Sequence, residues 1–123
     1  MRFVTDLNKG ILGKADPKEL WSEIISAIPN DLFVKKDFKI LVTACGHGSE
    51  AEVIIKHMLS LGITSQEAND SIFVLDKYKV FTNDMTRKGF KNVIKADFLT
   101  WETDMKFDVV VGNPPFKDPR GKN

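Results

Sequence analysis

The sequence predicts an α/β fold in which an open parallel sheet is flanked by helices. Short apolar, β-branched segments alternate with longer segments whose apolar residues recur at helical spacing. This alternation is typical of parallel strands joined by helical crossovers. Glycine or acidic residues follow several of the strand-like segments, and ligands of such sheets bind beyond the carboxyl ends of the strands.

The first predicted element is a leading helix within residues 12–30. Asp16 is a suitable N-cap, Pro17 fits the first helical position, and Glu19 completes a capping box. Apolar residues, Trp21 among them, then recur at helical spacing until a proline follows the predicted end. We expect this helix to cover the sheet with Trp21 in the core.

The βα core is predicted over residues 38–116. Its strands are expected at 38–43, 71–76, 92–96 and 107–112. One crossover helix should begin with a capping box from Ser49 to Glu52, and the next should cover about 78–88. Residues 63–70 are expected to form a polar connector.

Composition indicates one domain, residues 1–123, with 42% apolar and 28% charged residues. The net charge of +1 gives no strong electrostatic case for nucleic acid. A single cysteine excludes an internal disulfide framework and fits a reducing, cytoplasmic location. No apolar run is long enough for a bilayer, so we expect no membrane partner.

The loop Asn113-Pro114-Pro115-Phe116 follows the last predicted strand. Two consecutive prolines make the backbone rigid and extended. Amide and carbonyl oxygens there can accept hydrogen bonds from an exocyclic NH₂, and the phenyl ring can stack on a flat ligand. The loop is therefore the first candidate for a catalytic site.

A second candidate is Ala44-Cys45-Gly46-His47-Gly48, at a predicted strand-to-helix turn, where two glycines let a ligand approach the backbone. The third glycine of the dinucleotide fingerprint is missing, which counts against a nicotinamide enzyme. Cys45 is predicted to be a packed residue rather than a nucleophile. His47 is predicted to face solvent, and no metal site is expected.

Asp76 ends the second predicted strand, where its carboxylate can accept both hydroxyls of a ribose or can cap a helix. The residues leave both alternatives open.

These motifs together resemble those of S-adenosylmethionine-dependent amino-methyltransferases, above all adenine-specific (N6) DNA methyltransferases. Asn113 to Phe116 resembles their catalytic motif, and Ala44 to Gly48 resembles their Ala-Cys-Gly-x-Gly cofactor loop, with Val42 and Thr43 in place of the usual acid and proline. The resemblance implies S-adenosyl-L-methionine as cofactor. It implies that the cofactor is bound by Thr43, Ala44, Cys45, Gly46, Gly48, Asp76, Lys77, Asp97, Phe98 and Asn113.

In that family the acid of an Asp97-Phe98 pair accepts the cofactor's adenine amino group, and the next side chain packs on the ring. Phe3 to Thr5 resembles the N-terminal cofactor segment, with Asp6 replacing its proline. The resemblance implies that catalysis falls to Asn113, Pro114, Pro115 and Phe116, where Asn113 and Pro114 hold the target amine and Phe116 stacks on the flipped base.

The resemblance covers residues 3–116 and implies an incomplete Rossmann-like methyltransferase fold. Its open parallel sheet has the order 3-2-1-4, and the chain would be the N-terminal cofactor-binding half of a class I domain. Three further strands and a C-terminal DNA-recognition region would be missing. The fourth strand would then expose its edge to a homodimer partner or a second chain.

The expected function is adenine-N6 methylation of DNA, as in restriction-modification, by a truncated chain that is inactive alone. Two alternatives remain open. One is another amino acceptor, glutamine N5 in a protein or guanine N2 in ribosomal RNA. The other is a non-catalytic cofactor-binding or interaction fragment.

Overall fold

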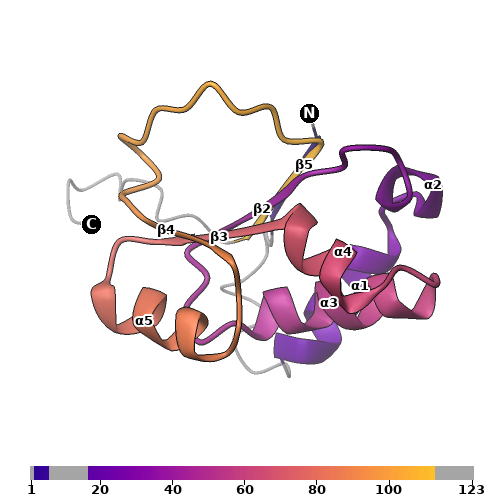
Figure 1. Ribbon diagram of the computed structural model, residues 1–123, viewed down its shortest axis with the longest axis horizontal. Helices are drawn as coiled ribbons and strands as arrows, with labels where there is room; N and C mark the ends of the chain where they lie inside the picture. The colour runs from indigo at the N-terminus through magenta and orange to yellow at the C-terminus, as the bar shows by residue number, and fades with distance from the viewer. Residues whose placement is uncertain (1, 6–16, 113–123) are drawn as a thin grey trace.

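A computed structural model describes residues 2–5 and 17–112, which form an all-parallel sheet of five strands with helices packed against it (Figure 1). The strands are β1 Arg2–Thr5, β2 Ile40–Thr43, β3 Ile72–Asp76, β4 Asn92–Lys95 and β5 Val109–Gly112. They lie in the order β1-β5-β2-β3-β4. For the four expected strands this is the predicted order 3-2-1-4, so the fold class is confirmed.

The fifth strand, β1, corrects one expectation. It pairs in parallel with β5, from Arg2 beside Val109 to Thr5 beside Gly112. The prediction that the fourth predicted strand has an exposed edge is therefore wrong, while association with a homodimer partner or a second chain stays a prediction. β1 already uses the main-chain hydrogen-bonding groups along that edge.

Five helices accompany the described strands. They are α1 Pro17–Ser26, α2 Asn30–Phe33, α3 Ser49–Ser60, α4 Ser65–Ser71 and α5 Lys79–Arg87. The leading helix and both crossover helices were expected, whereas α2 and α4 were not. In Figure 1, α1, α3 and α5 lie on one side of the sheet.

Helix α4 replaces the polar connector expected at 63–70. Thr64 caps it: Thr64 Oγ1 accepts from the Glu67 N–H at 3.1 Å, and Glu67 Oε1 accepts from the Thr64 N–H at 3.1 Å. This reciprocal capping box satisfies two donors at the helix start. Only Ala68 of the helix is fully buried, so the apolar periodicity that would have revealed α4 is weak.

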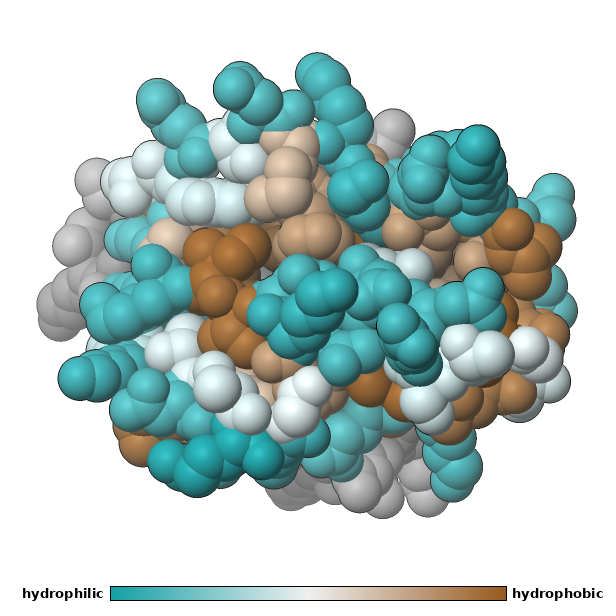
Figure 2. Space-filling model, viewed as in Figure 1, coloured by the Kyte–Doolittle hydropathy of each residue, from teal (hydrophilic) through white to brown (hydrophobic). Residues whose placement is uncertain are grey.

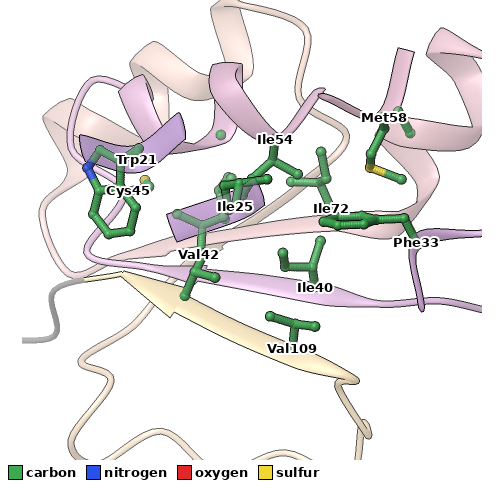
Figure 3. Packing of buried hydrophobic residues seen from close by; sticks show 14 of the residues in the cluster. Trp21, Ile25, Phe33, Ile40, Val42, Cys45, Ile54, Met58, Ile72 and Val109 are labelled. Carbon is green, nitrogen blue, oxygen red and sulfur yellow. The ribbon is translucent and has the colours of Figure 1, made fainter. Parts of the chain in front are cut away.

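The main core lies between the sheet and the helices (Figure 3). Trp21 and Ile25 of α1 and Ile54 of α3 pack against the strand residues Val42 and Ile72. Trp21 is 5% exposed, which confirms its predicted place in the core. All four residues of β2 are buried, as the parallel interior of an α/β sheet requires.

The second face of the sheet has no helix in the described part of the chain. The segment 97–108 arches over it (Figure 1). Trp101 and Phe107 of this segment contribute to a smaller cluster with Leu41 and Leu75. An extended segment, and no helix of the described residues, therefore covers this face.

Hydrophilic residues cover most of the face shown in Figure 2, and hydrophobic residues emerge only in small patches. Among the described residues, no helix combines the length and apolar character needed to cross a bilayer.

Candidate cofactor-binding site

A pocket of about 310 Å³ opens at the carboxyl ends of β2, β3 and β4. Its lining includes Ala44 and Gly46 after β2, Asp76 and Lys77 at the end of β3, and Asp97 and Phe98 after β4. Six residues predicted from the sequence thus meet around one cavity. Parallel strands bring this about, because their carboxyl ends share one edge of the sheet.

Asp76 connects the glycine loop after β2 with the turn that precedes α5. It is 5% exposed, its Oδ2 accepts from the Gly46 N–H at 3.1 Å, and its Oδ1 accepts from the Tyr78 N–H at 3.0 Å. The carboxylate therefore supports the turn before α5 as well as the glycine loop. Each carboxylate oxygen can accept more than one hydrogen bond, so Asp76 can still receive the hydroxyls of a diol.

The loop 44–48 owes its shape to left-handed backbone conformations. φ is +51° at Ala44, +53° at Gly46 and +94° at Gly48. Gly48 is the N-cap of α3, without a side-chain cap, so the capping box predicted from Ser49 is wrong. A Cβ at Gly48 would lie 2.8 Å from Sδ of the flexible Met85 side chain, which would have to shift, and the left-handed φ favours glycine there.

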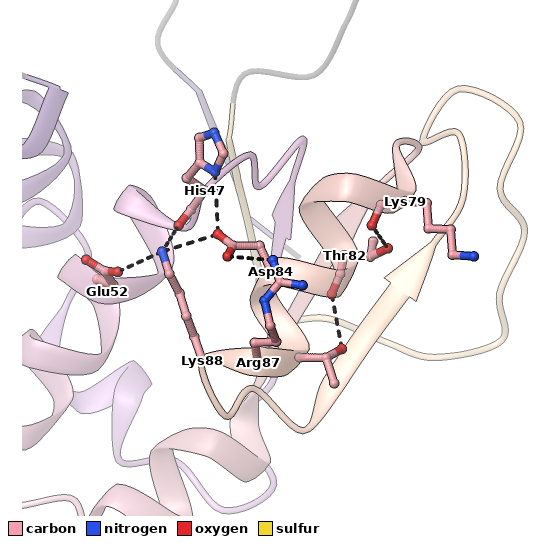
Figure 4. Close-up of polar contacts among 8 residues, drawn as sticks. His47, Glu52, Lys79, Thr82, Asp84, Arg87 and Lys88 are labelled. Atoms are coloured by element: carbon pink, nitrogen blue, oxygen red, sulfur yellow. Dashed lines mark hydrogen bonds and ion pairs between the residues drawn. The ribbon is translucent and has the colours of Figure 1, made fainter.

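A polar network ties this loop to α5 (Figure 4). His47 Nδ1 lies 3.4 Å from Asp84 Oδ2, and Lys88 Nζ donates to the His47 carbonyl. The contact with His47, aided by Arg87 and Lys88, lowers the pKa of Asp84. The His47 side chain is 72% exposed, which confirms the predicted solvent-facing position.

Asp97 and Phe98 form the wall of the pocket after β4. Asp97 Oδ1 accepts from the Leu99 N–H at 3.0 Å, and the Asp97 carbonyl accepts from the Trp101 N–H at 2.8 Å. These bonds fix a tight turn at which the carboxylate and the Phe98 ring both reach the cavity.

Tyr78 and Phe81 also line the pocket, and the sequence reasoning missed them. Their rings meet edge to face at 6.2 Å, and Lys77 Nζ lies 5.3 Å from the centre of the Tyr78 ring. Tyr78 is 55% exposed. An exposed aromatic residue two positions after an acid at a strand end was the available signal for a ligand contact.

Three predicted cofactor residues, Thr43, Cys45 and Gly48, do not line this pocket. Thr43 and Cys45 are buried, and Gly48 packs against Met85. Burial, with Asp76 and Glu50 nearby, raises the pKa of the Cys45 thiol to about 12. Cys45 is therefore a packed thiol, as predicted, and not an activated nucleophile.

Glu50, in the first turn of α3, is the second residue with a strongly shifted pKa. Burial raises the pKa of its carboxyl to about 7, and the Asp76 carboxylate contributes further, while its own N–H acts in the opposite direction. No group of histidine, cysteine and acidic side chains suited to a metal exists among the described residues.

Gly112 ends β5 beside Thr43 of β2. The next four residues, Asn113 to Phe116, and the predicted N-cap Asp16 lie outside the described residues.

A parallel sheet with a glycine loop after one strand and an acid at the end of the next is an arrangement typical of nucleotide-binding domains. The model of the family described as Eco57I restriction-modification methylase matches residues 19–123. The chain belongs to that family.

A type II methyltransferase, M.CvrRI of Paramecium bursaria Chlorella virus XZ-6E, is 40% identical over 58 residues. The alignment covers 36% of this chain and 15% of the viral protein.

Proposed function

We propose that the chain is the cofactor-binding half of a class I methyltransferase domain that transfers methyl from S-adenosylmethionine to the N6 amino group of adenine in DNA. The pocket around Asp76, in a chain of a restriction-modification methylase family, carries this proposal. The methylase family implies a methyl donor, and the donor set of the pocket suits an adenosyl group.

The fit can be argued residue by residue. Asp76 has lone pairs left for two ribose hydroxyls after its two backbone bonds. Asp97 uses one carboxylate oxygen in its turn, and the other can accept an adenine amino group. Phe98, Phe81 and Tyr78 offer aromatic faces and edges to the ring. When bound, S-adenosylmethionine supplies a methyl group activated by its sulfonium.

Asn113 to Phe116 are the residues that we assign to methyl transfer. We assign the Asn113 side-chain oxygen and the Pro114 carbonyl to accept the hydrogens of the target amine, so that its lone pair is directed at the methyl group. Pro115 keeps the loop rigid, and Phe116 stacks on the flipped base. Gly112 directly precedes Asn113 and is the last residue of β5. It lies beside Thr43, at the sheet edge where the pocket opens. Alignment and stabilisation of developing charge are then sufficient, without a covalent intermediate.

The acceptor is tested by tritiated methyl transfer, with the chain completed by the C-terminal part of a family member. Duplex DNA should be labelled at adenine N6. Asn113→Ala should lower kcat by roughly 100-fold or more, the loss typical of one transition-state hydrogen-bonding group, and leave donor affinity nearly unchanged. Asn83→Ala, at an exposed position of α5, is the matched control.

Label in protein or ribosomal RNA, with none in DNA, would establish another amino acceptor. Full activity in Asn113→Ala would remove the catalytic role given to this loop.

A further inference from the structure

Lys88 contacts the glycine loop 44–48 from the far end of α5. It is the C-cap of that helix, and its ammonium donates a hydrogen bond to the carbonyl oxygen of His47, 41 positions earlier in the chain. The Lys88 side chain is 37% exposed and does not line the pocket. Any effect of Lys88 on a ligand of the pocket must therefore pass through the loop.

Two acids hold the Lys88 ammonium in this position (Figure 4). Glu52 Oε1 of α3 lies 3.5 Å from Lys88 Nζ, and Asp84 Oδ2 of α5 lies 3.6 Å from it. An ammonium has three N–H donors, so it can meet the His47 carbonyl and both carboxylates at once. A hydrogen bond from a charged donor to a carbonyl is also stronger than one from a neutral donor. The contact is thus better defined than an isolated ion pair at the surface.

Helix α5 holds the His47 side chain as well. His47 Nδ1 lies 3.4 Å from Asp84 Oδ2, and the imidazole meets the Phe81 ring edge to face, with 4.9 Å between the ring centres. Phe81 itself lines the pocket. One residue of the glycine loop is therefore fixed through its ring and through its carbonyl, and both sets of contacts come from α5.

The loop needs such contacts because its backbone has unusual freedom. φ is positive at Gly46 and Gly48, on either side of His47, and glycine adopts positive and negative φ about equally readily. The pocket depends on one of these conformations, in which the Gly46 N–H donates to Asp76 Oδ2 at 3.1 Å. A fixed His47 carbonyl restricts the adjoining glycines and so favours the conformation in which Gly46 and Asp76 meet.

We propose that Lys88 is a positioning residue of the pocket, which holds the glycine loop in its ligand-binding conformation. The consequence for cofactor affinity rests on the proposed function. Lys88 acts through the His47 carbonyl, and the Gly46 N–H reports its effect. Removal of the ammonium should loosen the loop while the rest of the sheet and its helices stay closed.

Amide hydrogen exchange, measured by NMR without ligand, tests the hold on the loop. The N–H groups of Gly46 and Tyr78 donate to the two oxygens of the same carboxylate, Asp76, but only Gly46 belongs to the loop. Lys88→Met keeps most of the aliphatic stem and removes the ammonium. Exchange of the Gly46 N–H should become about tenfold faster or more, the effect typical of one hydrogen bond to a charged group. Exchange of the Tyr78 N–H should change by less than about twofold, because local opening exposes the loop alone whereas global unfolding exposes both amides.

Two further variants are the controls. Arg87→Met removes a cation from the same end of α5. Among the described residues the Arg87 side chain contacts Asp84 at 3.2 Å and none of the loop, so Gly46 exchange should stay within about twofold of wild type, as for an exposed ion pair. Lys88→Arg keeps a cationic donor and should restore slow exchange of the Gly46 N–H.

Calorimetric titration with S-adenosylhomocysteine tests the consequence for binding. Lys88→Met should weaken binding by about threefold or more, because the apparent affinity falls with the fraction of chains whose loop has the binding conformation. Lys88→Arg and Arg87→Met should retain the wild-type affinity. Circular dichroism verifies that each variant is folded.

Selective acceleration at Gly46 in Lys88→Met, together with the loss of affinity, supports the inference. Unchanged Gly46 exchange, equal acceleration at Gly46 and Tyr78, or the same acceleration in Arg87→Met overturns it. Unchanged affinity beside a selectively loosened loop also overturns it, because the ligand would then not depend on the loop that Lys88 holds. Absence of binding by the wild type refutes the proposed function instead, and the exchange comparison alone then decides whether Lys88 positions the loop.

Discussion

Gly112 and Thr43 lie side by side at the ends of β5 and β2, with no space for a side chain between them. A Cβ at Gly112 would be 2.4 Å from Thr43 Oγ1 and 2.5 Å from the Thr43 carbonyl oxygen. Gly112 also has φ +139°, where side chains are strained. Gly112 therefore lets the ends of β5 and β2 approach each other.

Gly112→Ala should lower the free energy of unfolding by about 3 kcal/mol or more, because overpacking and backbone strain add. Gly62→Ala is the matched control. Gly62 has φ +88° but nothing within 4 Å of its Cβ position, so it should cost only about 1–2 kcal/mol of strain. Urea denaturation measures both values. If both variants lose the same free energy of unfolding, the close contact between Gly112 and Thr43 adds nothing to the cost of the substitution.

The raised pKa of Glu50 predicts how stability depends on pH. Its folded-state pKa of about 7 lies above the ordinary 4.5, so the protonated form is the one favoured by folding. The stabilisation is complete below pH 4.5 and is lost as pH rises through 7.

Glu50→Gln cannot ionise. Its stability relative to wild type should therefore increase by about 3 kcal/mol between pH 4.5 and pH 8, the value of a shift of this size. Chemical denaturation of both proteins at the two pH values measures this difference. A constant difference across the range would mean that Glu50 titrates normally.

The capping box of α4 is also testable. Thr64→Ala removes the acceptor for the Glu67 N–H and should cost about 1 kcal/mol, the usual value of an N-cap side chain. Ser65→Ala, one position further along and exposed, should have little effect. Thermal denaturation distinguishes them, and similar melting temperatures for the two variants would argue against the cap.

Cys45 should be unreactive in the native state. It is 1% exposed and its thiol pKa is about 12, so almost no thiolate is present at pH 8. A colorimetric disulfide reagent should label it fast only after denaturation in guanidinium. Rapid labelling of the native chain would indicate that the loop above Cys45 opens readily.

Much of the sheet could be predicted because apolar strands and strand-end motifs are local signals. The positions after 43, 76 and 96 converge as expected, since parallel topology fixes where the strands end. Helix α4 could not be predicted from periodicity, because it buries one small residue, Ala68. Strand β1 was missed because four residues carry little pattern, and its pairing with β5 depends on a long-range contact.

Chemical environment was harder to predict than position. The sequence left two roles open for Asp76, ribose acceptor and helix cap. The structure shows that Asp76 supports the turn before α5 and also lines the pocket. The partial burial of Glu50 depends on tertiary packing around the first turn of α3, which no local pattern reports. Tyr78 and Phe81 were visible in the sequence, but only the fold shows that they face the same cavity as Phe98.

The central claim is that the pocket at Asp76 binds the adenosyl cofactor, and calorimetric titration with S-adenosylhomocysteine tests it most directly. One binding site per chain is expected. Asp76→Ala should weaken binding by roughly tenfold or more, because a charged hydrogen-bond acceptor is worth about 1.5–3 kcal/mol. Asp104→Ala, at an exposed position away from the pocket, should bind like wild type. Absence of binding by the folded wild-type chain, or equal affinities in all three proteins, would contradict the account.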